Sequence, residues 1–107
     1  MQQAKIIRNK QDVGLLSRED DGKYMFIYFN KYLNNENTPP ISVNFPKQKE
    51  RFVSEHLFSF FSALLSEGSM KEMQCRTLQI DENDDFTRLL KTATKDTIGS
   101  ILVEEII

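Results

Sequence analysis

The side chains that could carry chemistry are few. His56 is the single histidine and Cys75 the single cysteine of 107 residues, so a two-histidine zinc site is impossible and a catalytic triad would depend on His56 alone. His56 stands at the start of an expected helix, which favours an exposed or capping histidine over a general base. Cys75 has no histidine near it in the sequence and lies on an amphipathic segment, as a buried small hydrophobe does.

Motifs that bind phosphates or metals are also missing from the sequence. It contains no P-loop, no G-x-G-x-x-G and no H-E-x-x-H, and its four glycines stand far apart. The densest acidic run is Asp81, Glu82, Asp84 and Asp85, which is typical of a solvated helix start. We therefore expect no catalytic, metal-binding or cofactor-binding residues, no cofactor, and no enzymatic activity.

Length and charge narrow the class of protein further. With 39% hydrophobic residues, eight Phe and three Tyr, the chain predicts one folded domain over residues 1–107. It is too short for a kinase, a dehydrogenase or a barrel hydrolase, since a TIM barrel alone takes about 250 residues. The net charge of −2 shows no basic excess, so direct nucleic-acid binding by this chain alone is not expected.

The sequence also predicts a location inside the cell. One cysteine allows no internal disulfide, and Met1–Lys10 lacks the apolar centre of a signal peptide. The longest apolar stretch, Leu57–Leu65, is half a membrane span and contains serines. We expect a cytoplasmic protein with no membrane contact.

The first half of the chain has the pattern of strands. Four are expected: Ala4–Arg8, Val13–Arg18, Lys23–Phe29 and Ile41–Phe45. Asp20-Asp21-Gly22 is a hairpin signal, Asn34–Pro40 is a loop by composition, and Pro46 ends the fourth strand. In the third strand both faces are apolar, because Tyr24, Phe26 and Tyr28 alternate with Met25, Ile27 and Phe29.

The second half has helical periodicity. A first helix, capped by Ser54 and ended by Gly68, carries the stripe Leu57, Phe60, Phe61, Leu64 and Leu65. A second helix starts at Ser69, with apolar positions at Met70, Met73 and Cys75, and with Leu78 and Ile80 beyond. Asp81 is expected to cap a third, with the stripe Phe86, Leu89, Leu90 and Ala93, before Thr97–Val103 returns to β composition.

These elements predict an α+β fold. We expect a small, mainly antiparallel sheet of about four to five strands, with three helices packed on one face.

Six short motifs in this order resemble one family. They are Val13-Gly14-Leu15-Leu16, Phe26–Leu33, Ile41-Ser42-Val43-Asn44-Phe45-Pro46, Phe60–Gly68, Asn83-Asp84-Asp85-Phe86 with Leu89-Leu90, and Asp96–Ile101. Together they resemble the N-terminal subdomain of HipA, the kinase toxin of bacterial toxin–antitoxin systems, from about Ile6 to Val103. Two positions depart from the family pattern: Ser66 stands where proline is usual, and the residues after Pro46 lack a common glycine.

The resemblance implies that the chain binds a partner protein rather than catalysing a reaction. The chain is similar to HipS, the small subunit of HipBST-type systems, which binds a shortened HipA-like (HipT) serine/threonine kinase toxin and can act as its antitoxin. A helix-turn-helix HipB-like repressor is a further partner that the resemblance implies. The alternatives are a subunit that completes or activates the kinase, an unrelated scaffold or dimerisation module, and an independent enzyme that would depend on His56 or Cys75.

The expected partner-binding residues are those that the family motifs fix although secondary structure does not require them. They are Ser66, Glu67, Gly68, Ser69, Met70 and Asp96. A positive φ at Gly68 and a cap at Ser69 would make a rigid projecting corner, which loses little entropy on docking. Glu67 could instead bond backbone N–H groups of the next helix. Met70 is either a core filler or the apolar tip of the corner. Because the chain has no Trp, we expect a weaker or differently centred contact than an aromatic anchor gives.

Overall fold

The computed structural model describes residues 2–65, 68–92 and 101–106. In these residues a five-stranded antiparallel sheet has the strand order β4-β3-β2-β1-β5. The strands are β1 Gln2–Arg8, β2 Gln11–Arg18, β3 Tyr24–Tyr28, β4 Phe52–Ser54 and β5 Ile101–Ile106. The α+β class and the small antiparallel sheet expected from the sequence are confirmed.

Two tight hairpins build the sheet's first three strands. Asn9 and Lys10 join β1 to β2 with φ of 50° and 67°, the left-handed values that a two-residue hairpin turn requires. Between β2 and β3, Gly22 has φ of 88°, and Glu19 N donates to Lys23 O at 2.8 Å. The hairpin expected at Asp20-Asp21-Gly22 is therefore present.

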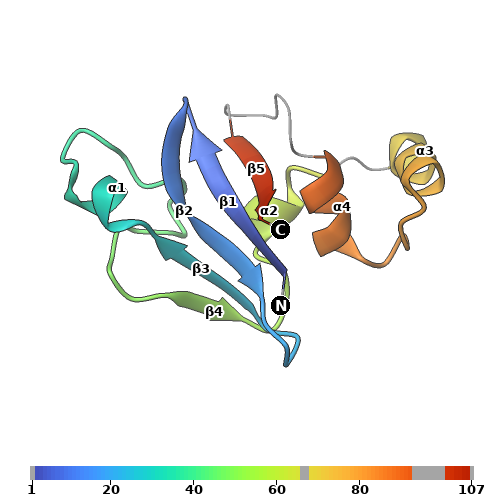
Figure 1. Ribbon diagram of the computed structural model, residues 1–107, viewed down its shortest axis with the longest axis horizontal. Coiled ribbons are helices and arrows are strands. Elements are labelled where there is room, and N and C mark those ends of the chain that lie inside the picture. Colours follow the sequence, from blue (N-terminus) through green and yellow to red (C-terminus); the bar gives the residue numbers. More distant parts are fainter. Residues whose placement is uncertain (1, 66–67, 93–100, 107) are drawn as a thin grey trace.

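The last strand returns to the first. β5 pairs antiparallel with β1, so that Gln3 lies opposite Ile106 and Arg8 opposite Ile101. Figure 1 shows β5 beside β1, and the pairing places the start of β1 next to the end of β5. The first strand is therefore internal to the sheet, with β2 on one side and β5 on the other.

Four helices are described: α1 Asn30–Asn34, α2 Ser59–Ser62, α3 Gly68–Leu78 and α4 Asp85–Thr92. In Figure 1, α2, α3 and α4 lie on the β5 side of the molecule, and α1 lies on the far side beyond β2. No described helix is long and apolar enough to cross a bilayer. The short α1 was not expected from the sequence.

One face of the sheet forms the core with the helices. Its strands contribute Ala4, Ile6, Leu16, Phe26 and Val103, all fully buried. The ring of Phe26 lies at the centre of this core. Its centroid is 5.1, 6.2 and 5.7 Å from the ring centroids of Phe45, Phe52 and Phe61, respectively. The apolar stripe expected on the last helix also packs here, since Phe86, Leu89 and Leu90 are buried in α4.

Gly14 allows β2 and β3 to approach each other. A Cβ at this position would lie 2.3 Å from the carbonyl oxygen of Ile27 and 3.0 Å from the Phe26 ring. Any side chain would therefore displace either the paired strand or the central ring. The glycine of the Val13-Gly14 motif thus has a packing role.

The prediction of a strand at Ile41–Phe45 is wrong. Ser42 O accepts a 3.0 Å hydrogen bond from Phe45 N, and Ser42 Oγ accepts one from Asn44 N at 3.3 Å, so these residues form a turn. Ile41 and Phe45 are buried at its two ends, while Val43 is 94% exposed between them. The fourth strand is instead Phe52–Ser54, which pairs with β3.

The long helix expected from Ser54 is also wrong. Ser54 belongs to β4 and pairs with Tyr24, and only Ser59–Ser62 is helical. The apolar positions of the expected stripe still face inward, because Phe61 and Leu65 are buried and Leu57, Phe60 and Leu64 pack against the core. The burial of these apolar side chains was predicted correctly, but they reach the core without a regular helix over the whole segment. Gly68, expected to end the first helix, and Ser69, expected to cap the second, are the first two residues of α3.

The cap of the last helix lies three residues beyond the expected Asp81. Asp84 Oδ1 accepts from Thr87 N at 3.1 Å, and Asp84 Oδ2 accepts from Thr87 Oγ1 at 2.7 Å, which is N-capping geometry. Asp81 instead accepts from Asn83 N at 2.8 Å in the preceding turn. Arg18 of β2 pairs with Asp84 at 3.1 Å, and this ion pair selects Asp84 by fixing α4 to the sheet.

Candidate functional site

Three of the six expected partner-binding residues, Gly68, Ser69 and Met70, lie within the described structure. Ser66, Glu67 and Asp96 fall outside the described residues, so the pairing of Glu67 with backbone N–H groups and the role of Asp96 stay predictions. Gly68 and Ser69 begin α3. Met70 is 48% exposed, which excludes the core-filler alternative for this residue and leaves it as an apolar side chain on the surface.

The same helix separates its sulfur-bearing residues into two environments. Met73 is exposed, one turn after Met70, whereas Cys75 is buried as a free thiol. The interpretation of Cys75 as a small buried hydrophobe is confirmed. Met70 and Met73 form an exposed apolar pair at the far end of the molecule, where α3 lies in Figure 1.

The geometry of His56 is that of a surface residue. It is exposed, and its backbone N donates to Ser54 Oγ at 3.1 Å. Among the described residues, no group of three or more His, Cys, Asp or Glu side chains is placed to hold a metal ion.

A second surface becomes visible only through the strand register. The sheet has a face opposite the core, and we call it the open face. The cross-strand partners Lys5–Leu15–Ile27, Ile7–Leu102, Met25–Val53 and Gln3–Ile106 lie on it. Its apolar members are Ile7, Leu15, Met25, Ile27, Val53, Leu102 and Ile106.

The open face is not part of the core. None of its seven apolar side chains belongs to the buried cluster or packs against it, and Val53 and Ile106, on the two edge strands, are 55% and 46% exposed. In an antiparallel sheet with one solvated face, outward positions are usually polar. Leu15, Met25, Ile27 and Val53 are neighbours on β2, β3 and β4, and the polar residues Gln3, Lys5, Ser17 and Glu104 share the face. An apolar patch of this kind is typical of an interaction site.

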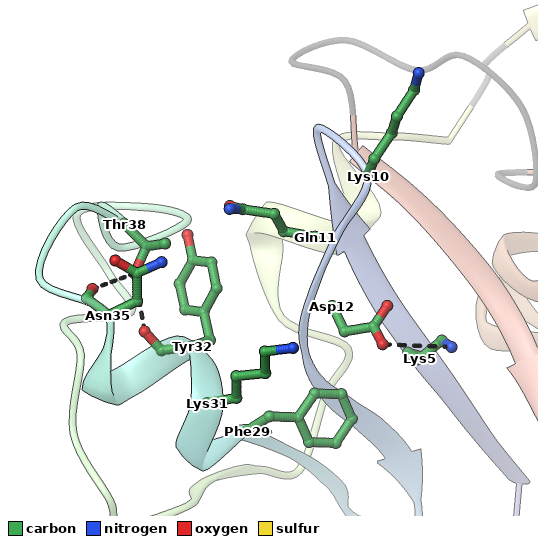
Figure 2. Close-up of a pocket in the computed structure, with 9 residues that line it drawn as sticks. All are labelled: Lys5, Lys10, Gln11, Asp12, Phe29, Lys31, Tyr32, Asn35 and Thr38. Carbon is green, nitrogen blue, oxygen red and sulfur yellow. Dashed lines mark hydrogen bonds and ion pairs between the residues drawn. The ribbon is translucent and has the colours of Figure 1, made fainter.

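At one end the open face leads into a hollow of about 570 Å³ between the β1–β2 hairpin and α1. Figure 2 shows the residues that line it: Lys5, Lys10, Gln11, Asp12, Phe29, Lys31, Tyr32, Asn35 and Thr38. Lys5 of β1 and Asp12 of β2 form an ion pair at 3.7 Å. Phe29 continues the alternation of Met25 and Ile27 beyond β3, so its ring extends the apolar surface into the hollow.

The hollow carries a surplus of positive charge. Lys5, Lys10 and Lys31 line it with one carboxylate, that of Asp12, and neither Lys10 nor Lys31 is ion-paired with another described residue. Figure 2 shows Lys31 reaching from α1 toward β2. Sequence reasoning missed these lysines, because they belong to three segments that only the fold places around one hollow.

The wall of the hollow is held by two tyrosines. The Tyr28 and Tyr32 rings stack with centroids 5.7 Å apart, and their hydroxyls donate to the carbonyl oxygens of Phe45 and Pro39. Ile41 N donates to the Tyr28 hydroxyl at 3.1 Å. Burial raises the pKa of Tyr28, and the hydrogen bond from Ile41 N opposes this only in part.

Lys47 stabilises the loop that follows α1 through hydrogen bonds. Lys47 Nζ donates to the carbonyl oxygens of Asn35 and Thr38, both at 2.9 Å, and lies 5.6 Å from the centroid of the Tyr32 ring. This lysine is thus a structural cation, whereas Lys10 and Lys31 remain available to a partner.

The structure is that of a small α+β domain with one sheet face outside its core. The sequence model of the HipA N-terminal domain matches residues 4–104, and the chain belongs to this family. Among solved structures, the N-terminal domain of HipA toxin superposes with a TM-score of 0.73 at 28% identity, over all of this chain and 94% of that one. The matched region is the N-terminal subdomain and not the catalytic kinase domain.

Two relatives place the domain in different contexts. An uncharacterised protein of Haemophilus influenzae is 32% identical over 101 residues, which are 94% of this chain and 90% of that protein. A putative kinase of Sinorhizobium fredii, Y4mE, is 32% identical over 89 residues, which are 83% of this chain but 21% of the relative. The same domain thus makes up nearly all of one relative and about a fifth of the other.

Proposed function

We propose that this protein is a non-catalytic partner of a HipA-like serine/threonine kinase toxin, and that it binds the kinase and neutralises it as an antitoxin. The observation that carries the proposal is the double occurrence of the domain. In the Sinorhizobium relative it is a minor part of a putative kinase, whereas the Haemophilus relative consists almost wholly of it. A domain found both within and apart from a kinase is suited to bind a kinase in trans.

The surface of the domain supports a binding role rather than a catalytic one. An apolar sheet face, a basic hollow beside it and an exposed methionine pair on α3 are available to another protein, while the lone histidine is exposed and the lone cysteine is buried. We expect the partners to meet in the cytoplasm, and a helix-turn-helix HipB-like repressor to join the same assembly.

Coexpression with a HipA-like kinase from the same organism tests the proposal. The tagged kinase should retain the protein through affinity purification and gel filtration, and cells expressing both should grow where cells expressing the kinase alone do not. Failure to copurify would contradict the proposal.

The growth assay also separates the second candidate, a subunit that completes or activates the kinase. Such a subunit would copurify equally well but would leave the toxicity unchanged or increase it. In vitro phosphorylation by the purified kinase, with and without the protein, gives the sign of the effect directly.

A further inference from the structure

We infer that the open face, together with the basic hollow at its end, is the surface that docks on the kinase. This inference rests on the proposed function and names the site and the chemistry of its partner. The kinase surface it fits is apolar at the centre and carries a carboxylate or another anionic group where it meets Lys31 and Lys10.

The apolar content of the open face is the first step. Protein interfaces have an apolar centre and a polar rim. Here Leu15 and Ile27 occupy the centre of the sheet face, on neighbouring strands and opposite each other, while Lys5 and Glu104 form an opposed pair toward β5. The core needs none of these side chains, because it closes on the other face.

The second step is what covers this face in a relative. Because the matched segment is 21% of the putative Sinorhizobium kinase, most of that protein lies outside this segment, and we take this remainder to pack on the domain. The helix-bearing face of the sheet already has its covering in α2 and α4. The open face is the large apolar area left for the kinase to bury.

The charge of the hollow sets the orientation. Lys31 and Lys10 have no anionic partner among the described residues, and complementary charge at a rim steers association and fixes register. An acidic group of the kinase beside Phe29 and Lys31 would satisfy them.

The experiment compares face variants for kinase binding with the full-length protein. In M25K/V53E a cross-strand apolar pair of the open face becomes an opposite-charge pair, which two neighbouring strands tolerate. We expect it to weaken kinase binding at least about tenfold, since central apolar contacts dominate interface energetics. The matched control V43E makes the same Val→Glu change at an exposed site off this face and should bind within about twofold of wild type.

Charge reversal tests the hollow separately. K31E should weaken binding several-fold, whereas K71E, on α3 and away from the hollow, should not. Circular dichroism and thermal melting establish which variants are folded. If M25K/V53E does not fold, I106E at the exposed edge of the face replaces it in the comparison.

The outcomes distinguish this inference from the proposed function. If wild type binds the kinase and the folded open-face variants bind equally well, the inference is overturned while the proposed function stands. If M70D abolishes binding and the open-face variants do not, the interface is the α3 corner and the inference is likewise wrong. If wild type itself does not bind, both fail together.

Discussion

At the scale of single residues, Tyr28 couples the core to the loop after α1. Its hydroxyl donates to Phe45 O and accepts from Ile41 N, so it joins the two ends of the turn that had been expected to be a strand. A buried polar group that loses its partner costs about 1–3 kcal/mol.

We therefore predict that Tyr28→Phe lowers the free energy of unfolding by about 1–3 kcal/mol, because it strands both the Phe45 carbonyl and the Ile41 amide. Urea denaturation followed by circular dichroism measures the change. Tyr24→Phe is the control, with an expected change under about 0.5 kcal/mol, since Tyr24 is less buried and its hydroxyl has no hydrogen bond within the described structure. Equal losses in the two variants would contradict the assigned role of Tyr28.

Asp84 gives the fold a dependence on pH. Burial alone would raise the pKa of Asp84, but hydrogen bonds from Thr87 and the charge of Arg18 outweigh it and hold the pKa below its ordinary value of 3.8. A carboxyl group with a depressed folded-state pKa stabilises the protein above its unfolded pKa. That stability is lost as the pH falls through the folded-state value.

Asp84→Asn keeps a side chain that can cap α4 but removes the charge that pairs with Arg18. It should accordingly cost up to about 1 kcal/mol at pH 7, and the difference from wild type should shrink below pH 4. Thermal melts between pH 7 and pH 2.5 measure it. Glu82→Gln, a nearby exposed acid with no contact among the described residues, should leave the curve unchanged. A difference that stays constant with pH would show that the Asp84 charge is unimportant.

At the scale of elements, the sequence was most informative where local signals and tertiary pairing agree. The two hairpins have their own turn residues, so β1, β2 and β3 were predictable. Ile41–Phe45 misled because two buried residues four apart suit a turn anchored at both ends as well as a strand. The stripe from Leu57 to Leu65 misled for a related reason: Phe52–Ser54 pairs with β3, and that tertiary contact overrides the helical pattern before Ser59.

The close pairing of β2 with β3 depends on the absence of a side chain at Gly14. Gly14→Ala should destabilise the protein by about 1–3 kcal/mol, the range for overpacking a core, because the new Cβ meets the Ile27 carbonyl and the Phe26 ring. Gly22→Ala is the comparison. Its site is open but has φ of 88°, so we expect a loss of about 1 kcal/mol from backbone strain alone. Chemical denaturation of both variants gives the two values. A smaller loss at Gly14 would mean that the strands can separate at little cost.

At the scale of the whole molecule, the candidate site was only partly predictable. The corner from Ser66 to Met70 was expected from a family resemblance. Met70 is exposed, and the role of the corner in partner binding stays a prediction. One signal of the open face was present in the sequence, because Met25, Ile27 and Phe29 make β3 apolar on both sides. The full face could not be assembled from it, since the register of five strands decides which side chains share a surface.

The charged hollow leads to a prediction about association kinetics. If Lys31 steers the kinase, the association rate constant should fall as sodium chloride rises from 50 to 500 mM, since such steering is screened by salt, while K31E should show a flatter dependence. Stopped-flow or biolayer interferometry measures this. Parallel salt curves for wild type and K31E would show that the hollow takes no part in the encounter.

The return of β5 to β1 has a consequence for the order of events during synthesis. β1 leaves the ribosome before the other described elements and β5 leaves it after them, yet the two are neighbours in the sheet. Until β5 emerges, one side of β1 exposes unpaired backbone amides and carbonyls, and such an edge readily pairs with another chain. The sheet of a nascent chain therefore stays incomplete until β5 has been synthesised, and in that interval a chaperone would be expected at the exposed edge of β1.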